Sequence, residues 1–162
     1  RGSIYTGMRD FEKAKVAFEK AHELLPTSFE PDFNLAELLY VQEKYALAET
    51  AFGKLLEKHA KIREDVRHLT TFKIIVCELK QNKIAEAEKN AKAFTFMDDT
   101  PAYYFTKAAF AFQKGDQQEA RDWLTKAGNI FKQGQNPVYV DSLMEAKWIP
   151  SLTVPEDGKE PK

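Results

Sequence analysis

The sequence predicts an all-α protein built as a stack of antiparallel helix pairs. Three observations lead to this fold class. A small–large–small set of apolar residues recurs along the chain, apolar residues recur at spacings of three and four, and the long segments between turns are rich in Ala, Glu and Lys. Only 7 Gly and 7 Pro occur in 162 residues, so few positions interrupt a helix. In such a stack each pair buries its apolar face against its neighbours.

The small–large–small set starts near the beginning of the chain and returns three times. Its first members are Ala14, Ala48, Ala87 and Ala120, which are 34, 39 and 33 positions apart. A small side chain lets two antiparallel helices approach closely, and the large residue that follows fills the space beside it. The longer middle step coincides with a charged connection, Lys58 to Asp65. Four copies predict four helix pairs, the first of them truncated.

The first three helices follow from apolar spacing and from their end signals. Segment 10–25 opens with Asp10, a candidate N-cap before Phe11, and Pro26 stops the helix. Segment 29–42 is apolar over a wide surface, which predicts a helix that is covered on more than one side, as in the inner layer of a stack. Segment 45–60 repeats the pattern of the first helix with Ala48, Phe52 and Leu55.

The next four helices are expected at 66–81, 84–96, 101–114 and 117–132. Thr100-Pro101 is a cap followed by proline at the first helical position, and Gly115 marks a tight turn. In the third repeat Ala91 stands where a large residue is usual and Phe94 where a small one is. We interpret this exchange as compensation that keeps the core volume constant.

The chain ends with one more helix and a polar segment. Asn136-Pro137 starts the helix, roughly 137–148, and we assign 136–148 as a C-terminal capping helix that covers the last repeat. Residues 149–162 are rich in Pro, Glu, Asp, Gly and Lys and are assigned as a polar tail. The repeats themselves occupy residues 1–132.

The second helix of each pair resembles the tetratricopeptide repeat (TPR), whose second helix carries Ala-x-x-x-Phe-x-x-Ala and ends near a proline. Residues Ala14, Phe18, Ala21 and Pro26 match all four positions. The second repeat matches at Leu35, Ala36, Tyr45, Ala48, Phe52 and Leu55, and the fourth at Gly115, Asp116, Ala120 and Ala127. The resemblance covers about 2–132, with Tyr5 as the aromatic of a truncated first helix. No Trp occupies the usual early position, and the third repeat matches weakly. The resemblance implies a right-handed superhelical, TPR-like solenoid.

The resemblance also implies a binding groove, because the first helices of TPR proteins line a concave surface that holds an extended peptide or a helix. The corresponding residues here are mainly apolar, which favours an apolar anchor on the partner. They are Phe33, Asn34, Glu37, Tyr40, Phe72, Lys73, Val76, Phe105, Ala109 and Phe112. The alternative is that these side chains are simply core. A carboxylate clamp of the chaperone-binding kind is rejected, since Leu69 stands where that clamp needs a lysine.

Composition argues against several classes of partner. With 24 basic and 25 acidic residues the net charge is −1, which gives no general attraction to nucleic acid or to an anionic membrane. No apolar stretch approaches the roughly 20 residues that span a bilayer, so no membrane insertion is expected. Cys77 is the single cysteine and lies in an apolar run, where we expect a buried, inert thiol.

No motif predicts catalysis, a metal or another cofactor. Glu19 and His22 have the spacing of a di-iron ligand pair, but the pair occurs once, so we interpret it as a solvated Glu–His pair. Basic residues between Lys54 and Lys73 alternate with acidic ones and are expected to form a solvated connection. The chain has no zinc pattern, no phosphate-binding glycine loop and no nucleophile elbow.

The sequence therefore predicts a non-catalytic module that binds a peptide or helix of another protein. The alternatives are a TPR-type secretion chaperone that masks an apolar client segment, a self-associating structural repeat, and a helical-bundle enzyme. The chain begins Arg1-Gly2-Ser3 instead of Met, so we expect a fragment of a soluble protein. The absence of a signal sequence therefore does not decide between the cytoplasm and the periplasm.

Overall fold

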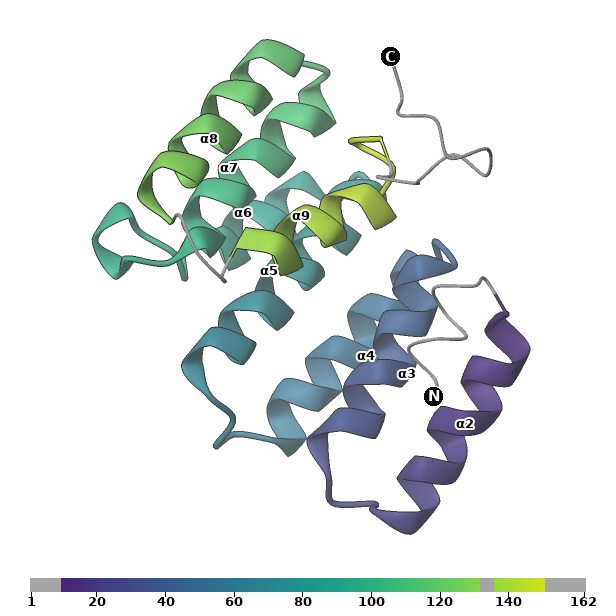
Figure 1. Ribbon diagram of the computed structural model, residues 1–162. Helices are drawn as coiled ribbons and strands as arrows, with labels where there is room; N and C mark the ends of the chain where they lie inside the picture. Colours follow the sequence, from purple (N-terminus) through teal and green to yellow (C-terminus); the bar gives the residue numbers. More distant parts are fainter. Residues whose placement is uncertain (1–9, 132–135, 151–162) are drawn as a thin grey trace, which may run out of the picture.

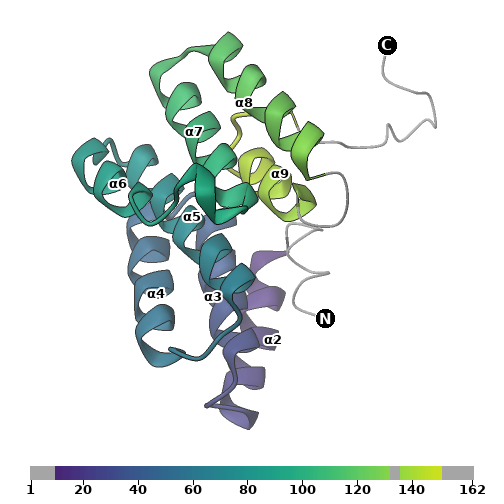
Figure 2. The same cartoon turned by 90° about the vertical axis from the view of Figure 1, so that its left-hand side faces the viewer.

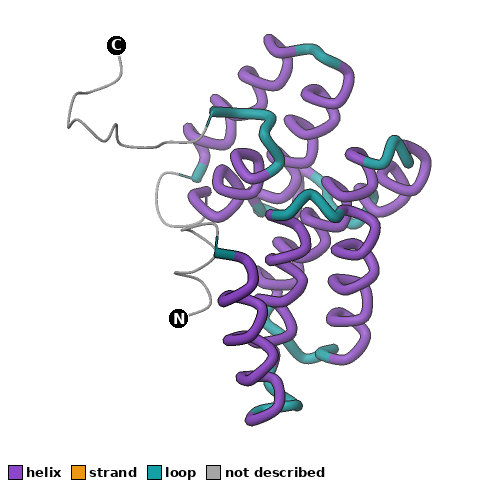
Figure 3. The backbone as a smooth tube through the Cα atoms, turned by 90° about the vertical axis from the view of Figure 1, so that its right-hand side faces the viewer, coloured by secondary structure: helices purple, strands orange, loops and turns teal. Residues whose placement is uncertain are grey.

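The structure, a computed structural model, describes residues 10–131 and 136–150, apart from the side chain of Phe96. In these ranges every regular element is a helix (Figures 1 and 3). The elements are α2 (Phe11–Leu24), α3 (Phe29–Val41), α4 (Tyr45–Lys58), α5 (Glu64–Lys80), α6 (Ile84–Ala91), the 3₁₀ turn η1 (Phe96–Asp98), α7 (Pro101–Lys114), α8 (Gln117–Ile130) and α9 (Asn136–Glu145). The predicted all-α class is confirmed. Tyr5 and the tail from residue 151 onward lie outside the described residues.

Adjacent helices pack in a stack. Each helix from α2 to α5 packs on the next, α5 also packs on α7, and α7 packs on α8 (Figure 2). A small core cluster joins α2 to α3 through Ala14, Phe18 and Leu38. The larger core runs from α3 to α9 and contains most of the buried aromatic side chains.

Several end signals read from the sequence are confirmed. The Asp10 side chain accepts a hydrogen bond from the Lys13 amide at 3.3 Å, and the Thr100 side chain accepts one from the Ala102 amide at 3.3 Å. Pro101 is the first residue of α7, and Gly115 follows its last residue with φ of 82°. Such a left-handed residue closes the C-terminus of a helix at little cost when it is glycine.

The first small residue of each small–large–small set is fully buried. Ala14, Ala48, Ala87 and Ala120 all have 0% of their surface exposed. Phe18 and Phe52, the large residues that follow the first two, are also buried. The small residues that recur along the sequence are therefore also the residues that recur in the packed core.

The turns inside the helix pairs repeat with the same register. Glu43, Asn82 and Gly115 each have positive φ and each lie five residues before a buried alanine. In all three turns the next amide donates to the carbonyl five residues earlier, as in Lys44 to Leu39, Lys83 to Glu78 and Asp116 to Ala111. This is the Schellman closure of a helix. Only one of the three turns uses glycine; Asn82 is of a residue type that tolerates positive φ, whereas Glu43 is not.

The third repeat departs from the prediction. Helix α6 ends at Ala91, so the expected helix 84–96 is too long. Phe94 lies beyond the helix but is buried, and its ring meets the His68 ring edge-on with 5.4 Å between centroids. The large side chain therefore fills the core from the loop, which explains why it stands at an unusual place in the pattern.

Helix α9 returns across the stack. It packs on α5 and α7 (Figures 1 and 2). Its first residue is tied to the end of α8, since the Asn136 side-chain Nδ2 donates to the Ala127 and Phe131 carbonyls at 3.1 and 2.8 Å. The sequence assigned this helix as a cap over the last repeat, and that role stays a prediction. In the structure α9 presents Tyr139 and Leu143, both buried, to the apolar residues of the first helices.

Candidate functional site

The ten residues predicted to line a groove come from three helices, α3, α5 and α7, and we call the surface that they form the first-helix face. Seven of them are buried in the structure: Tyr40, Phe72, Lys73, Val76, Phe105, Ala109 and Phe112. The other three, Phe33, Asn34 and Glu37, are half-buried. The structure thus assigns most of these side chains to the core, and their role in binding stays a prediction.

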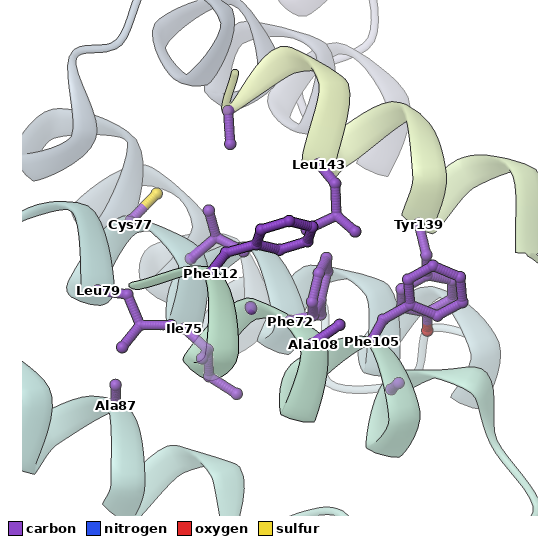
Figure 4. Close-up of a cluster of buried hydrophobic side chains, with 14 of the residues drawn as sticks. Phe72, Ile75, Cys77, Leu79, Ala87, Phe105, Ala108, Phe112, Tyr139 and Leu143 are labelled. Carbon is purple, nitrogen blue, oxygen red and sulfur yellow. The ribbon is translucent and has the colours of Figure 1, made fainter. Parts of the chain in front are cut away.

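Helix α9 covers the part of this face that α5 and α7 form (Figure 4). The Tyr139 ring stacks on Phe105 with 5.2 Å between centroids and meets Phe72 at the same distance but edge-on. Both geometries are favourable for aromatic pairs. Leu143, one turn later, is fully buried on the same side of α9. An apolar helix face therefore fills the apolar surface.

The residues after α9 extend this cover. The Trp148 ring lies parallel to Phe112 with 5.9 Å between centroids, and the Lys80 ammonium lies 4.3 Å from the centre of the same indole. Such a cation over an indole face is attracted by the ring electrons. The Lys147 ammonium also lies 3.0 Å from the Glu43 carboxylate at the end of α3.

Tyr40 supplies a polar anchor for α9 from α3. Its hydroxyl donates a hydrogen bond of 2.7 Å to the carbonyl of Ser142, and the Ser142 hydroxyl donates to the Val138 carbonyl at 2.8 Å. Burial raises the pKa of Tyr40 well above its ordinary value, so the hydroxyl remains a donor at any physiological pH. This bond fixes α9 along its axis, which apolar packing alone does not do.

A buried cluster of charges lies beside that anchor. The Lys73 ammonium on α5 is only 3% exposed, forms an ion pair with the Glu37 carboxylate on α3, and lies 4.5 Å from the centre of the Tyr40 ring. Glu145, at the end of α9, is half-buried close to the same lysine. Burial, followed by the charges of Glu37 and Asp141, outweighs the attraction of Lys73 and raises the pKa of Glu145 to about 7.

Phe33, a half-buried residue of the face, belongs to its other end. The Phe33 ring packs against Phe29 and Phe52, with 5.4 and 5.8 Å between centroids. Its partners come from α3 and α4, so this residue joins one helix pair internally. Figure 4 shows that Phe105 and Phe112 of α7 instead point toward α9.

Sequence reasoning missed a second polar cluster, which is centred on Asp32 and joins α2, α3 and α4. One carboxylate oxygen lies 2.8 Å from His22 Nδ1, and the other lies 2.9 Å from both Lys58 Nζ and His59 Nε2. The Lys58 ammonium also donates to the Pro26 carbonyl at 2.8 Å. The sequence paired His22 with Glu19 because the two are one helical turn apart, whereas the observed partner lies on the next helix.

Replacing Asp32 with asparagine should lower the free energy of unfolding by about 1–2 kcal/mol at neutral pH. Burial raises the pKa of Asp32, but hydrogen bonds from His59 and Lys58 and the charge of Lys58 outweigh it, so the pKa is lowered overall. A lowered pKa contributes stability above the ordinary value of 3.8, and that stability is lost as the pH falls through the folded value. The cost of the substitution should therefore shrink on acidification.

Urea unfolding of the wild type and of Asp32→Asn at pH 7 and near pH 3 measures this difference. Glu57→Gln is the matched control, because this carboxylate is exposed on the same helix as Lys58. A cost that is equal at both pH values, or equal for the two variants, would contradict the role given to Asp32.

The remaining sequence candidates are placed as follows. Cys77 is fully buried, as predicted, and burial raises the pKa of its thiol well above the ordinary value, which disfavours the reactive thiolate. Two cations at or near the connection after α4 have partners: Arg63 pairs with Asp65, and Arg67 donates to the Ala60 carbonyl. Within the described ranges no group of three or more His, Cys, Asp and Glu side chains is arranged to hold a metal ion.

Among the helices that the structure describes, none combines the length and apolar character needed to cross a membrane. A comparison with protein-family models finds no match, and a comparison with curated proteins finds none. The resemblance to the TPR family therefore rests on the residues that carry it.

Proposed function

We propose that this chain is a non-catalytic protein-binding module whose first-helix face receives an amphipathic helix of a partner protein. The helix pairs, on this proposal, form a right-handed superhelical, TPR-like solenoid, and the first-helix face is its concave surface. The observation that carries the proposal is that the chain's own α9, a helix, lies on this face. A surface that accepts one amphipathic helix has the shape and the chemistry to accept another.

The contacts of α9 describe what such a partner needs. It needs an aromatic side chain at the place of Tyr139, to pack between Phe72 and Phe105. It needs an aliphatic side chain one turn later at the place of Leu143, and a backbone carbonyl within reach of the Tyr40 hydroxyl. A second aromatic, at the place of Trp148, would stack on Phe112.

A helix that carries this pattern must displace α9, since both need the same side chains. Displacement is feasible because α9 is only 10 residues long, and isolated helices of that length are marginal in water. The contacts of α9 with the first-helix face, and not its own helical propensity, keep it docked. A longer partner helix with the same pattern makes more contacts with this face and can therefore displace α9.

Binding can be tested with a fluorescein-labelled peptide of residues 136–150. The full chain with Leu143→Asp should bind this peptide, because a carboxylate in place of a fully buried side chain drives its own α9 off the face. The wild-type chain should bind the peptide more weakly, since its own α9 competes. Fluorescence anisotropy measures both affinities, and circular dichroism checks that the variant keeps the rest of its helices.

The matched control peptide carries Tyr139→Ser and Leu143→Asp and should not bind. If the Leu143→Asp chain is folded and binds neither peptide, or binds both equally, the first-helix face is not a helix-binding site. Polar substitutions of Phe72 or Phe105 are unsuitable for this test, because both side chains are core residues with 0% and 2% exposure.

A further inference from the structure

The end of α9 brings a second carboxylate to a buried ion pair. Lys73 is the buried ammonium, and Glu37 is already its ion-pair partner. The Glu145 carboxylate makes no hydrogen bond or ion pair with any residue in the described part of the chain. Ionised, it would add a second negative charge beside one lysine at a place where water is partly excluded.

The groups around Glu145 give it no other compensation. Those that act on it electrostatically, element by element, are Lys73 from α5, Glu37 and Tyr40 from α3, Tyr45 from α4 and Asp141 from α9 itself. Only the first is a cation. Burial raises the pKa of Tyr45 as well, so both phenols stay neutral near pH 7 and neither adds a charge. The balance disfavours an ionised Glu145 for as long as α9 is docked.

Release of α9 removes this conflict, because the carboxylate then enters water. We infer that α9 is a releasable cover of the first-helix face, and that ionisation of Glu145 favours its release as the pH rises through neutrality. The inference rests on the proposed function for what release exposes, namely the site for a partner helix. Release itself needs no partner and is measured without one.

The direction of the effect follows from proton linkage. Docking raises the pKa of Glu145 from 4.5 to about 7, so the docked state binds the proton more tightly than the released state. The contribution of protonated Glu145 to the docking of α9 is therefore complete below about pH 4.5 and is lost as the pH rises through about 7. A shift of this size corresponds to at most roughly a 300-fold change in the docking equilibrium. Because water remains around the side chain, we expect a smaller change, of at least about tenfold.

Trp148 reports the state of α9, because its ring stacks on Phe112 when the segment is docked. In a Trp123→Phe background it is the single tryptophan of the chain. We expect acrylamide to quench its fluorescence more strongly as the pH rises from about 5.5 to about 8.5, with a midpoint near neutrality. Hydrogen exchange of residues 136–149 in the unmodified chain, corrected for the intrinsic rate at each pH, should show the same transition.

Glu145→Gln keeps the shape of the side chain but cannot ionise, so α9 should stay docked across this range. Asp141→Asn, an exposed residue of the same helix, is the matched control and should keep the transition at a slightly lower pH. Quenching and exchange that do not change with pH in the wild-type sequence, or a transition that survives in Glu145→Gln, would overturn the inference. A peptide that fails to bind the Leu143→Asp chain would overturn the proposed function and leave this result standing.

Discussion

Replacing Phe72 with alanine should lower the free energy of unfolding by about 3–5 kcal/mol. Its ring is fully buried and packs edge-on against Tyr139, so the substitution removes a large apolar side chain and leaves a cavity between α5 and α9. The surrounding helices are fixed by their other contacts and cannot close that cavity completely. Urea unfolding followed by circular dichroism measures the loss.

Leu47→Ala is the matched control for this prediction, because Leu47 is 58% exposed on α4 and should cost less than about 0.5 kcal/mol. Phe72→Leu should fall between the two, since it keeps most of the apolar volume. A loss below about 1 kcal/mol for Phe72→Ala would mean that this residue is not in the core that the structure describes.

Replacing Lys73 with methionine should lower the free energy of unfolding by about 2–4 kcal/mol at neutral pH. Methionine keeps most of the apolar stem, so the substitution mainly removes the charge. The Glu37 carboxylate then loses its ion-pair partner, and Glu145 loses the one cation among the described residues that acts on it. The cost should be larger at pH 8 than at pH 5.5, because protonation of Glu145 relieves part of the excess negative charge.

Two further variants separate the charge from the packing. Lys73→Met combined with Glu37→Gln should recover part of the lost stability, because it leaves no uncompensated ion between α3 and α5. Glu37→Gln alone should cost less than Lys73→Met, since the Glu145 carboxylate still acts on Lys73 and can replace Glu37 as its counter-charge. If the double variant is as unstable as the sum of the single ones, the ion pair is not the reason for burying this lysine.

The helices and their register could be predicted because local signals and packing agree. A buried alanine at the start of each second helix leaves a spacing that can be read directly, and Thr100-Pro101 and Gly115 mark their boundaries by backbone chemistry. The turn at Glu43 could not be read in this way. Glu43 adopts positive φ although it is neither glycine nor asparagine, so only the surrounding helix pair reveals it, whereas Asn82 is of a type that tolerates this conformation.

The residues of the first-helix face could be picked out from the sequence, but their burial could not. The repeat spacing places Phe72 of α5 and Phe105 of α7 at corresponding positions of their helices, yet no pattern in the sequence shows that α9 returns to cover them. The apolar residues of α9 fit equally well a helix that caps the end of the stack and a helix that packs on the first helices. Asp32 was missed for a similar reason, since its three partners lie on two other helices.

The bond from Tyr40 to Ser142 joins residues that are 102 positions apart in the chain. Helix α9 is the last helix described, so a ribosome completes α3, α5 and α7 before it completes their cover. During synthesis the aromatic residues of those helices that face α9 therefore lack their cover until this helix has been made. A partner or chaperone that acts during synthesis meets this surface while it is still open.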